Sequence, residues 1–245
     1  MIPKSHPRYE SLLLRDKMVK ASKKGYLADS AMIAHGRGEA FDYLIGERTT
    51  YPAKRAMYVA VAALLLSNNP VISVNGNATA LAVEEIIELA NSVGAKIEIN
   101  LFYRTDDRVK IITQIYKDLG YDKILGTLDD DIEYLNDIKN NRASASKTGI
   151  YSADTILIPL EDGDRAEILK KSGKNIITID LNPLSRTSKM SDVSIMDNIV
   201  RAIPFMTKIA EDLKTQDKQV LMEIVNDFDN EKNLKESLEQ IKLKE

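Results

Sequence analysis

The stretch VISVNGNATALAVEEIIELANSVG, residues 71–94, decides the class of fold that this sequence predicts. Its short apolar and β-branched start is typical of a buried strand, and the NGN turn at 75–77 marks where that strand ends. Residues 79–93 then place apolar side chains at helical spacing, and Gly94 is a stop signal for a helix. The stretch therefore predicts one strand followed directly by one helix.

The same alternation continues toward the C-terminus with short connections. Since a strand, a helix and a strand in this order favour parallel pairing, we expect an α/β fold with a mostly parallel sheet and flanking helices. Strands are predicted at 96–102, 123–125, 155–160, 175–181 and 193–195, and helices at 106–119, 164–171 and 198–214.

The region before residue 70 reads as helical, with segments at 9–24, 27–45 and 52–67, the second of them interrupted at 35–38. We expect residues 1–214 to form a single α/β domain with this helical N-terminal part. Residues 215–245 are rich in charge, with apolar side chains at helical spacing, which predicts a charged amphipathic helical extension. One or two helices packed on the core or on a partner chain, and a frayed tail, both remain open.

Composition excludes several classes of protein. Of the 245 residues, 44% are hydrophobic, which is enough to bury a core. A net charge of -3 argues against a general nucleic-acid binder. The absence of Cys and the presence of two His exclude disulfides, Cys-based metal sites and multi-His metal centres. The longest apolar stretch, 56–66, is far shorter than the ~20 residues of a membrane-spanning helix, so we expect a cytoplasmic protein with no membrane partner.

Ligands of parallel α/β sheets bind beyond the carboxyl ends of the strands. That rule directs attention to Asn75 and Asn77, whose amides could hold a polar substrate, although an Asn-Gly turn is the simpler explanation. Arg104 follows the next strand and could clamp a phosphate or form a surface salt bridge. The acidic segment 161–164 could bind magnesium, but a carboxylate at a helix N-cap is the interpretation we favour.

The segment His35-Gly36-Arg37-Gly38 is unusual, because each Gly inside a helix costs about 1 kcal/mol relative to Ala. The glycines could clear space around the Arg37 guanidinium for an anion, or they could simply break the helix.

The loop DLNPLSRT at 180–187 concentrates groups suited to a nucleotide. Asp180 at a strand end could accept ribose hydroxyls, and Arg186 with Thr187 could hold phosphates. A polar loop stiffened by Pro183 is the alternative.

Six blocks together resemble one family. They are IAHGRGEAFDYL (33–44), GERTT (46–50), PVISVNGN (70–77), NLFYRT (100–105), PLEDGDR (159–165) and DLNPLSRT (180–187). In order and at natural spacing they are similar to the archaeal 4-phosphopantoate–β-alanine ligases, also called phosphopantothenate synthetases. The resemblance spans roughly residues 5–214, and the segment from 216 onward lies outside it.

The resemblance implies a Rossmann-like homodimer of coenzyme A biosynthesis. Its reaction would join 4-phosphopantoate to β-alanine with ATP and Mg²⁺, through an acyl-adenylate, and release AMP and pyrophosphate. We place Arg37 and His35 at the catalytic centre, and Asn75, Asn77 and Arg104 near the acid and the amine; the metal ligands and the general base stay unassigned. The ATP contacts that the resemblance implies are Arg15, Arg37, Asp180, Leu181, Asn182, Arg186, Thr187, Asn198 and Ile199.

Two other functions fit the same loops. A kinase or phosphatase acting on a small phosphorylated acid would use similar phosphate-binding groups. A non-enzymatic regulator would bind a nucleotide without turnover.

Overall fold

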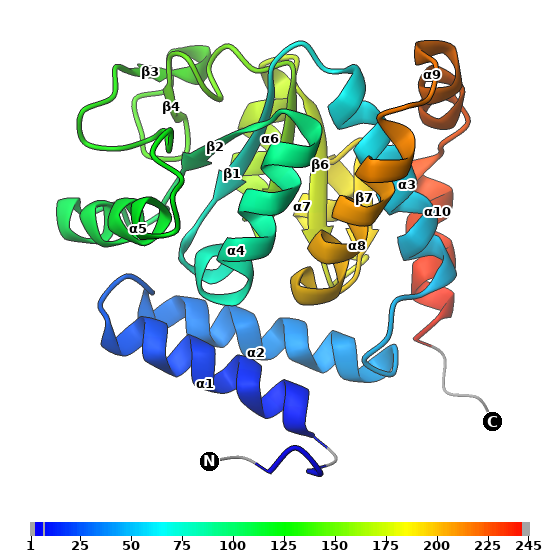
Figure 1. Cartoon of the computed structure of the whole chain (residues 1–245), viewed down its shortest axis with the longest axis horizontal. Helices are drawn as coiled ribbons and strands as arrows, with labels where there is room; N and C mark the ends of the chain where they lie inside the picture. Colours follow the sequence, from blue (N-terminus) through cyan, green and yellow to red (C-terminus); the bar gives the residue numbers. More distant parts are fainter. Residues whose placement is uncertain (1–2, 7, 242–245) are drawn as a thin grey trace.

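A computed structural model describes residues 3–6 and 8–241, and it confirms the α/β fold (Figure 1). Five strands form one sheet in the order β2-β1-β5-β6-β7, and every pair in it is parallel. A separate antiparallel pair joins β3 to β4. The strands are β1 (Pro70–Val74), β2 (Lys96–Ile99), β3 (Ile132–Tyr134), β4 (Ser144–Ser146), β5 (Thr155–Pro159), β6 (Asn175–Asp180) and β7 (Val193–Met196).

Helices cover both faces of this sheet, and two more lie across its carboxyl edge (Figure 1). A 3-10 turn at Leu135–Asp137 precedes β4. The helices are α1 (Tyr9–Lys23), α2 (Asp29–Leu44), α3 (Tyr51–Leu66), α4 (Gly76–Val93), α5 (Asp106–Asp118), α6 (Gly163–Lys171), α7 (Arg186–Met190), α8 (Ile199–Leu213), α9 (Lys218–Asn226) and α10 (Asn230–Glu239).

The central strands are buried on both faces, as their β-branched sequences predict. Alternate residues of β1 point into different cores: Ile72 packs with α3, α4, α5 and α8, whereas Val71 packs with α6 and the β4 region. This alternation follows from the two-residue period of a strand. The sheet is therefore a rigid layer whose carboxyl edge carries the loops.

Capping side chains begin the helices at that edge. Asn75 accepts a hydrogen bond from Ala78 N at 3.0 Å and caps α4. Asp162 accepts one from Arg165 N at 2.9 Å and caps α6, which confirms the N-cap interpretation of the acidic segment. Ser185 and Asn198 cap α7 and α8 in the same way. The capped helix starts hold the edge loops in defined positions.

Two local predictions were wrong, and two elements were missed. Helix α2 is continuous through residues 35–38, so the glycines do not break it. Residues 123–125 form no named strand; Leu125 makes an isolated bridge to Glu98. The sequence analysis did not predict the β3–β4 pair or α7. These two elements have short polar sequences that lack a hydrophobic period.

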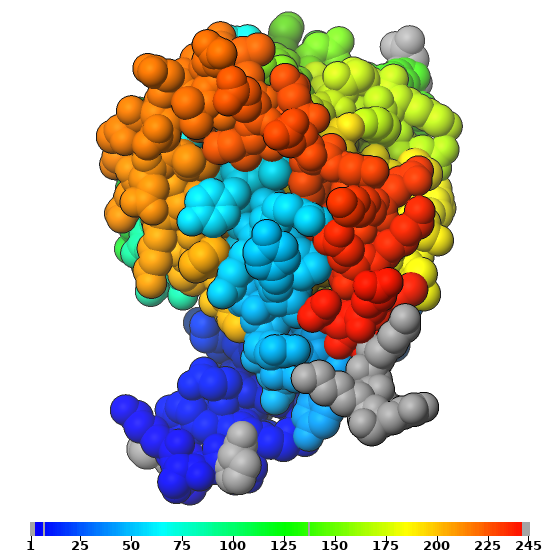
Figure 2. Space-filling model, turned by 90° about the vertical axis from the view of Figure 1, so that its right-hand side faces the viewer, coloured from blue at the N-terminus to red at the C-terminus, as the bar shows by residue number. Residues whose placement is uncertain are grey.

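The α1–α2 hairpin lies under the carboxyl edge of the sheet, and in Figure 2 α1 projects beyond the body of the molecule. Lys17 of α1 donates a hydrogen bond of 3.0 Å to Leu81 O of α4. That carbonyl lies beside Ala82, whose φ of -148° and ψ of 36° interrupt the helical geometry. The lysine thus satisfies a backbone group at the kink.

The C-terminal extension forms α9 and α10, which pack on the same core as α3, as Figure 2 also shows. Asn230 accepts a 2.9 Å hydrogen bond from Ser194 N, and Asn233 donates one of 2.8 Å to Ser194 O. Both side chains therefore bond to the backbone of β7, the edge strand. This part of the extension is a pair of packed helices; residues 242–245 lie outside the described residues.

Candidate functional site

A cavity of about 600 Å³ lies between the carboxyl edge of the sheet and α2. One wall comes from the segments that follow β5, β6 and β7, and Asn77 after β1 adds to it. The opposite wall is α2. This is the position at which parallel α/β sheets bind ligands.

The α2 wall presents His35, Arg37 and Glu39 to the cavity. Among the described residues, Arg37 has no hydrogen-bond or ion-pair partner, so its guanidinium is available to an anion. Gly38 brings α2 close to the β6 loop: a Cβ built on it would lie 3.5 Å from Leu181 Cδ1. The two walls therefore lie close together at Gly38.

The loop after β6 is organised by the carboxylate of Asp180. Its Oδ1 accepts hydrogen bonds from Leu181 N at 2.7 Å and Asn182 N at 3.1 Å. Its Oδ2 accepts from Ser185 Oγ at 2.5 Å and Ser188 Oγ at 3.3 Å. Asp180 therefore fixes the shape of the loop that lines the cavity.

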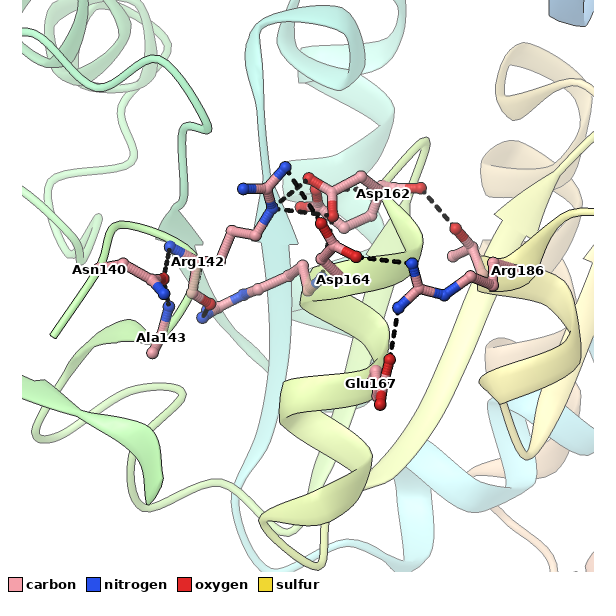
Figure 3. Close-up of polar contacts among 10 residues, drawn as sticks. Asn140, Arg142, Ala143, Asp162, Asp164, Glu167 and Arg186 are labelled. Atoms are coloured by element: carbon pink, nitrogen blue, oxygen red, sulfur yellow. Dashed lines mark hydrogen bonds and ion pairs between the residues drawn. The ribbon is translucent and has the colours of Figure 1, made fainter. Parts of the chain in front are cut away.

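Arg186 starts α7 and lies at the rim of the cavity. Figure 3 shows its guanidinium between Asp164, at 2.7 Å, and Glu167. The arginine stem passes over Gly163, where an added Cβ would lie 2.6 Å from Arg186 Cβ. Neighbouring Thr187 donates a 2.8 Å hydrogen bond to Glu161 O and so joins α7 to the loop after β5.

Asn198 and Ile199 bring the start of α8 to the same cavity. The Asn198 amide donates to Asp42 Oδ2 at 2.8 Å and to Glu39 Oε1 at 3.2 Å, both on α2. The two walls are therefore tied together by hydrogen bonds beside the cavity.

Glu161 lines the cavity directly after β5. Burial raises the pKa of its carboxyl to about 7, against the lowering effect of the Asp162 backbone N–H and of Arg165. The residue before it, Leu160, has a φ of 54°, which is the left-handed region that side-chain-bearing residues rarely adopt. Its carbonyl accepts a 3.0 Å hydrogen bond from Asn75 Nδ2, which holds this conformation.

Two further ionisable groups on α2 are shifted. Burial and the nearby charge of Arg15 lower the pKa of His35, so the imidazole is neutral at neutral pH. Burial and the charge of Asp42 raise the pKa of Glu39. The α2 wall therefore combines the Arg37 cation with two groups, His35 and Glu39, whose pKa values are shifted by burial and by neighbouring charges.

Most of the nucleotide-site residues implied by the sequence meet at this cavity. They are Arg37, Asp180, Leu181, Asn182, Arg186, Thr187, Asn198 and Ile199, and His35 and Asn77 join them.

Three predicted site residues lie elsewhere. Arg15 lines a second cavity of about 410 Å³ between α1 and α2, which shares His35 and Glu39 with the first. Asn75 is engaged by backbone groups as described above. Arg104 donates to Gly126 O at 2.9 Å and Thr127 O at 3.1 Å, outside the lining of the main cavity. Their functional roles stay predictions.

Glu39 was not among the predicted site residues, and Glu161 was considered only as part of the acidic segment 161–164. Both could have been found. Since α2 is continuous, Glu39 lies four residues from His35 on one helix face, but the expected break hid this relationship. Glu161 directly follows a buried strand at the ligand-binding edge.

Within residues 3–6 and 8–241, no group of three or more His, Asp or Glu side chains is arranged to hold a metal ion. The same part of the chain has no helix that combines the length and hydropathy needed to cross a bilayer.

Comparison with known proteins identifies the family. The model of the phosphopantothenate/pantothenate synthetase family matches residues 52–244, so the likeness extends through the C-terminal helices that the sequence analysis had left outside it. A 4-phosphopantoate–β-alanine ligase of Thermococcus onnurineus is 51% identical, covering 98% of this chain and 92% of its own length. Proteins of that name from Thermococcus kodakarensis and Methanosarcina mazei are 50% identical, each over 98% of this chain and over 92% and 94% of their own lengths. The chain therefore belongs to the phosphopantothenate/pantothenate synthetase family.

Proposed function

We propose that this protein is a ligase of coenzyme A biosynthesis that joins 4-phosphopantoate to β-alanine, using ATP and releasing AMP and pyrophosphate. The observation that carries the proposal is the cavity of about 600 Å³ at the carboxyl edge, where Arg37 and Arg186 meet the β6 loop and the start of α8. The names of relatives with about half of their residues identical support the choice of substrates.

The chemistry requires an activated acid. A carboxylate is a poor acceptor for an amine until one oxygen becomes a good leaving group, and adenylation supplies that group. The protein then acts by positioning the reactants and stabilising charge. Arg37, free of partners among the described residues, suits the phosphates of ATP, and the neutral imidazole of His35 lines the cavity beside it.

Arg186 would have to change partners to hold a phosphate. Its ion pairs with Asp164 and Glu167 are at the surface, and more than half of the arginine side chain is exposed. Exposed pairs contribute little free energy, so a polyphosphate can compete for the guanidinium.

Mg²⁺ would enter the cavity bound to the phosphates of ATP. Magnesium usually binds to nucleotides through phosphate oxygens and water, with few protein ligands. This fits a cavity in which the carboxylates of Asp180 and Asp162 already accept hydrogen bonds from their own loops.

We also propose that the protein is a cytoplasmic homodimer. Helix α2 leaves large apolar side chains exposed, including Ile33, Tyr43 and Leu44. A second copy would bury such a face. Sedimentation analysis that gives the mass of one chain would refute the dimer.

The decisive experiment is incubation with ATP, Mg²⁺, 4-phosphopantoate and β-alanine, followed by assay of the nucleotide and of the amide. We expect AMP, pyrophosphate and the amide in equal amounts. ADP formed without consumption of β-alanine would identify a kinase. ATP binding without turnover would identify a regulator.

A further inference from the structure

The carboxylate of Glu161 has one oxygen held and one available. Oε1 accepts a 2.9 Å hydrogen bond from the backbone N–H of Asp162. Oε2 has no hydrogen-bond partner among the described residues. It is also not fully buried, so part of its surface is accessible. Glu161 lines the main cavity, so this carboxylate belongs to a residue at the space in which a ligand would bind.

The backbone on both sides fixes the position of this carboxylate. Leu160 donates its N–H to Ile179 O at 3.0 Å and is held in the left-handed region. Glu161 O accepts the 2.8 Å hydrogen bond from Thr187 Oγ1 of α7. Strained backbone held by its surroundings is a frequent feature of functional sites.

The surrounding charges come from several elements. The charged groups that act on the carboxylate are Arg142, from the segment before β4, Asp162, which caps α6, and Arg165 of α6. Across and around the cavity lie His35, Arg37 and Glu39 of α2, with Asp180 and Arg186 on the β6 side. Burial and the charge of Asp162 favour the neutral form of Glu161, whereas the Asp162 backbone N–H, Arg165 and Arg142 favour its ionised form.

We propose that Glu161 is the general base that takes the proton from the amine of the amino-acid substrate. The inference rests on the proposed ligase function. In the step, the amine nitrogen forms a bond to the acyl carbon and the bond from that carbon to the AMP oxygen breaks. The electron pair leaves with AMP, and the proton of the nitrogen goes to Glu161 Oε2.

Other ionisable groups at the cavity are less suited to this role. Both oxygens of Asp180 accept hydrogen bonds from the loop. Glu39 Oε1 is bonded to the Asn198 amide that also bonds Asp42, so this carboxylate takes part in the contact between the two walls. The His35 Nε2 atom is enclosed without a partner among the described residues, so it lacks access to an incoming amine. A base with a pKa near the working pH is the most efficient kind, and Glu161 meets that condition.

The test compares Glu161→Gln with wild type in two half-reactions. Gln has nearly the same shape and keeps an oxygen for the Asp162 N–H, but it cannot accept the proton. We expect exchange of pyrophosphate into ATP, dependent on 4-phosphopantoate, to stay at the wild-type rate. Amide formation with β-alanine should fall by about 100-fold or more. Glu161→Asp should recover part of this loss, and Glu88→Gln, on the exposed side of α4, should change neither rate.

A second readout uses hydroxylamine, which is uncharged at neutral pH and needs no base to attack. Glu161→Gln should form the hydroxamate at the wild-type rate while it fails with β-alanine. In wild type, the rate of the amide-forming step should rise with pH through about 7 and then level off, and this rise should be lost in the variant.

Three results would overturn the role of Glu161. They are a wild-type amide rate in Glu161→Gln, an equal loss of both half-reactions, and a selective loss of amide formation in His35→Gln instead. Failure of the unmodified protein to form the amide would refute the ligase function itself, which is a distinguishable outcome.

Discussion

Asp42 Oδ2 accepts a 3.1 Å hydrogen bond from Arg201 Nη1, although the two residues are 159 positions apart in the sequence. The same guanidinium contacts Asp197, at 2.6 Å, whose other oxygen accepts from Thr49 at 2.6 Å. This buried network joins the end of α2 to the start of α8. It therefore sets the distance between the two walls of the cavity.

Replacing Asp42 should destabilise the fold. Asp42→Asn leaves the half-buried Arg201 with one carboxylate instead of two, and removing one partner of a buried ion pair costs roughly 3 kcal/mol. Urea unfolding measures this loss. The control is Asp16→Asn, which removes an exposed pair with Lys20 and should cost less than about 1 kcal/mol. Equal losses in the two variants would contradict a structural role for the network.

Arg37→Ala should nearly abolish ligase activity and leave the fold intact. Arg37 is exposed on α2 and has no partner among the described residues, so its loss removes a charge from the cavity without breaking a contact. Removal of one charge-stabilising group typically lowers kcat by about 100-fold or more. Lys189→Ala removes an exposed cation of α7 outside the cavity lining and should retain activity. A folded Arg37→Ala protein with full activity would refute the assignment.

Asn182→Ala should weaken ATP binding. The side chain accepts a 2.9 Å hydrogen bond from Leu184 N and lines the cavity, so its removal loosens the β6 loop and deletes a polar contact. A loss of about 1.4 kcal/mol corresponds to a tenfold higher Kd in calorimetry. Asn91→Ala, on the exposed side of α4, should bind ATP as wild type does. An unchanged Kd in Asn182→Ala would count against the nucleotide loop.

Glu98 should make stability fall as pH rises. It lies buried on β2, and burial raises its pKa from 4.5 to about 7, although Ser146 N and Ile150 N donate hydrogen bonds to it at 2.8 and 2.6 Å. The folded state therefore binds a proton that the unfolded state releases between pH 4.5 and about 7, and stability is lost across that window, by roughly 3 kcal/mol.

The measurement is the free energy of unfolding against pH for wild type and Glu98→Gln. The difference between the two curves should change between pH 4.5 and about 7. The raised pKa of Glu161 also makes stability fall as pH rises. Both proteins contain Glu161, so its contribution cancels in the difference between the two curves. Parallel curves would show that Glu98 does not titrate in this window.

The sequence predicted the five-stranded sheet well, because each of its strands is a short apolar run between turn signals. The prediction failed for segments whose own residues do not favour the structure that they adopt in the fold. The β3–β4 pair contains Ile-Glu-Tyr and Ser-Ala-Ser, which carry no strand signal of their own. Helix α2 continues through both glycines: Gly38 lies near Leu181 at the edge of the sheet, whereas a Cβ added at Gly36 would have no atom within 4 Å.

The site was predictable to the extent that position along a parallel sheet determines it. Loops after β5, β6 and β7 meet because parallel strands end at one edge. What the sequence could not show was the direction of individual side chains. Asn75 and Arg104 follow strands as predicted, yet both bond to backbone carbonyls. These hydrogen bonds join segments that are distant in the sequence, so they can be seen only in the folded structure.

The asparagines of α10 have a consequence for the behaviour of the chain in concentrated solution. An open edge strand offers unpaired N–H and C=O groups to any neighbouring molecule. Asn230 and Asn233 occupy those groups at Ser194, as another strand would. A chain truncated before Asn230 would expose β7 as a template for aggregation, so the terminal helix keeps neighbouring molecules from adding to the sheet.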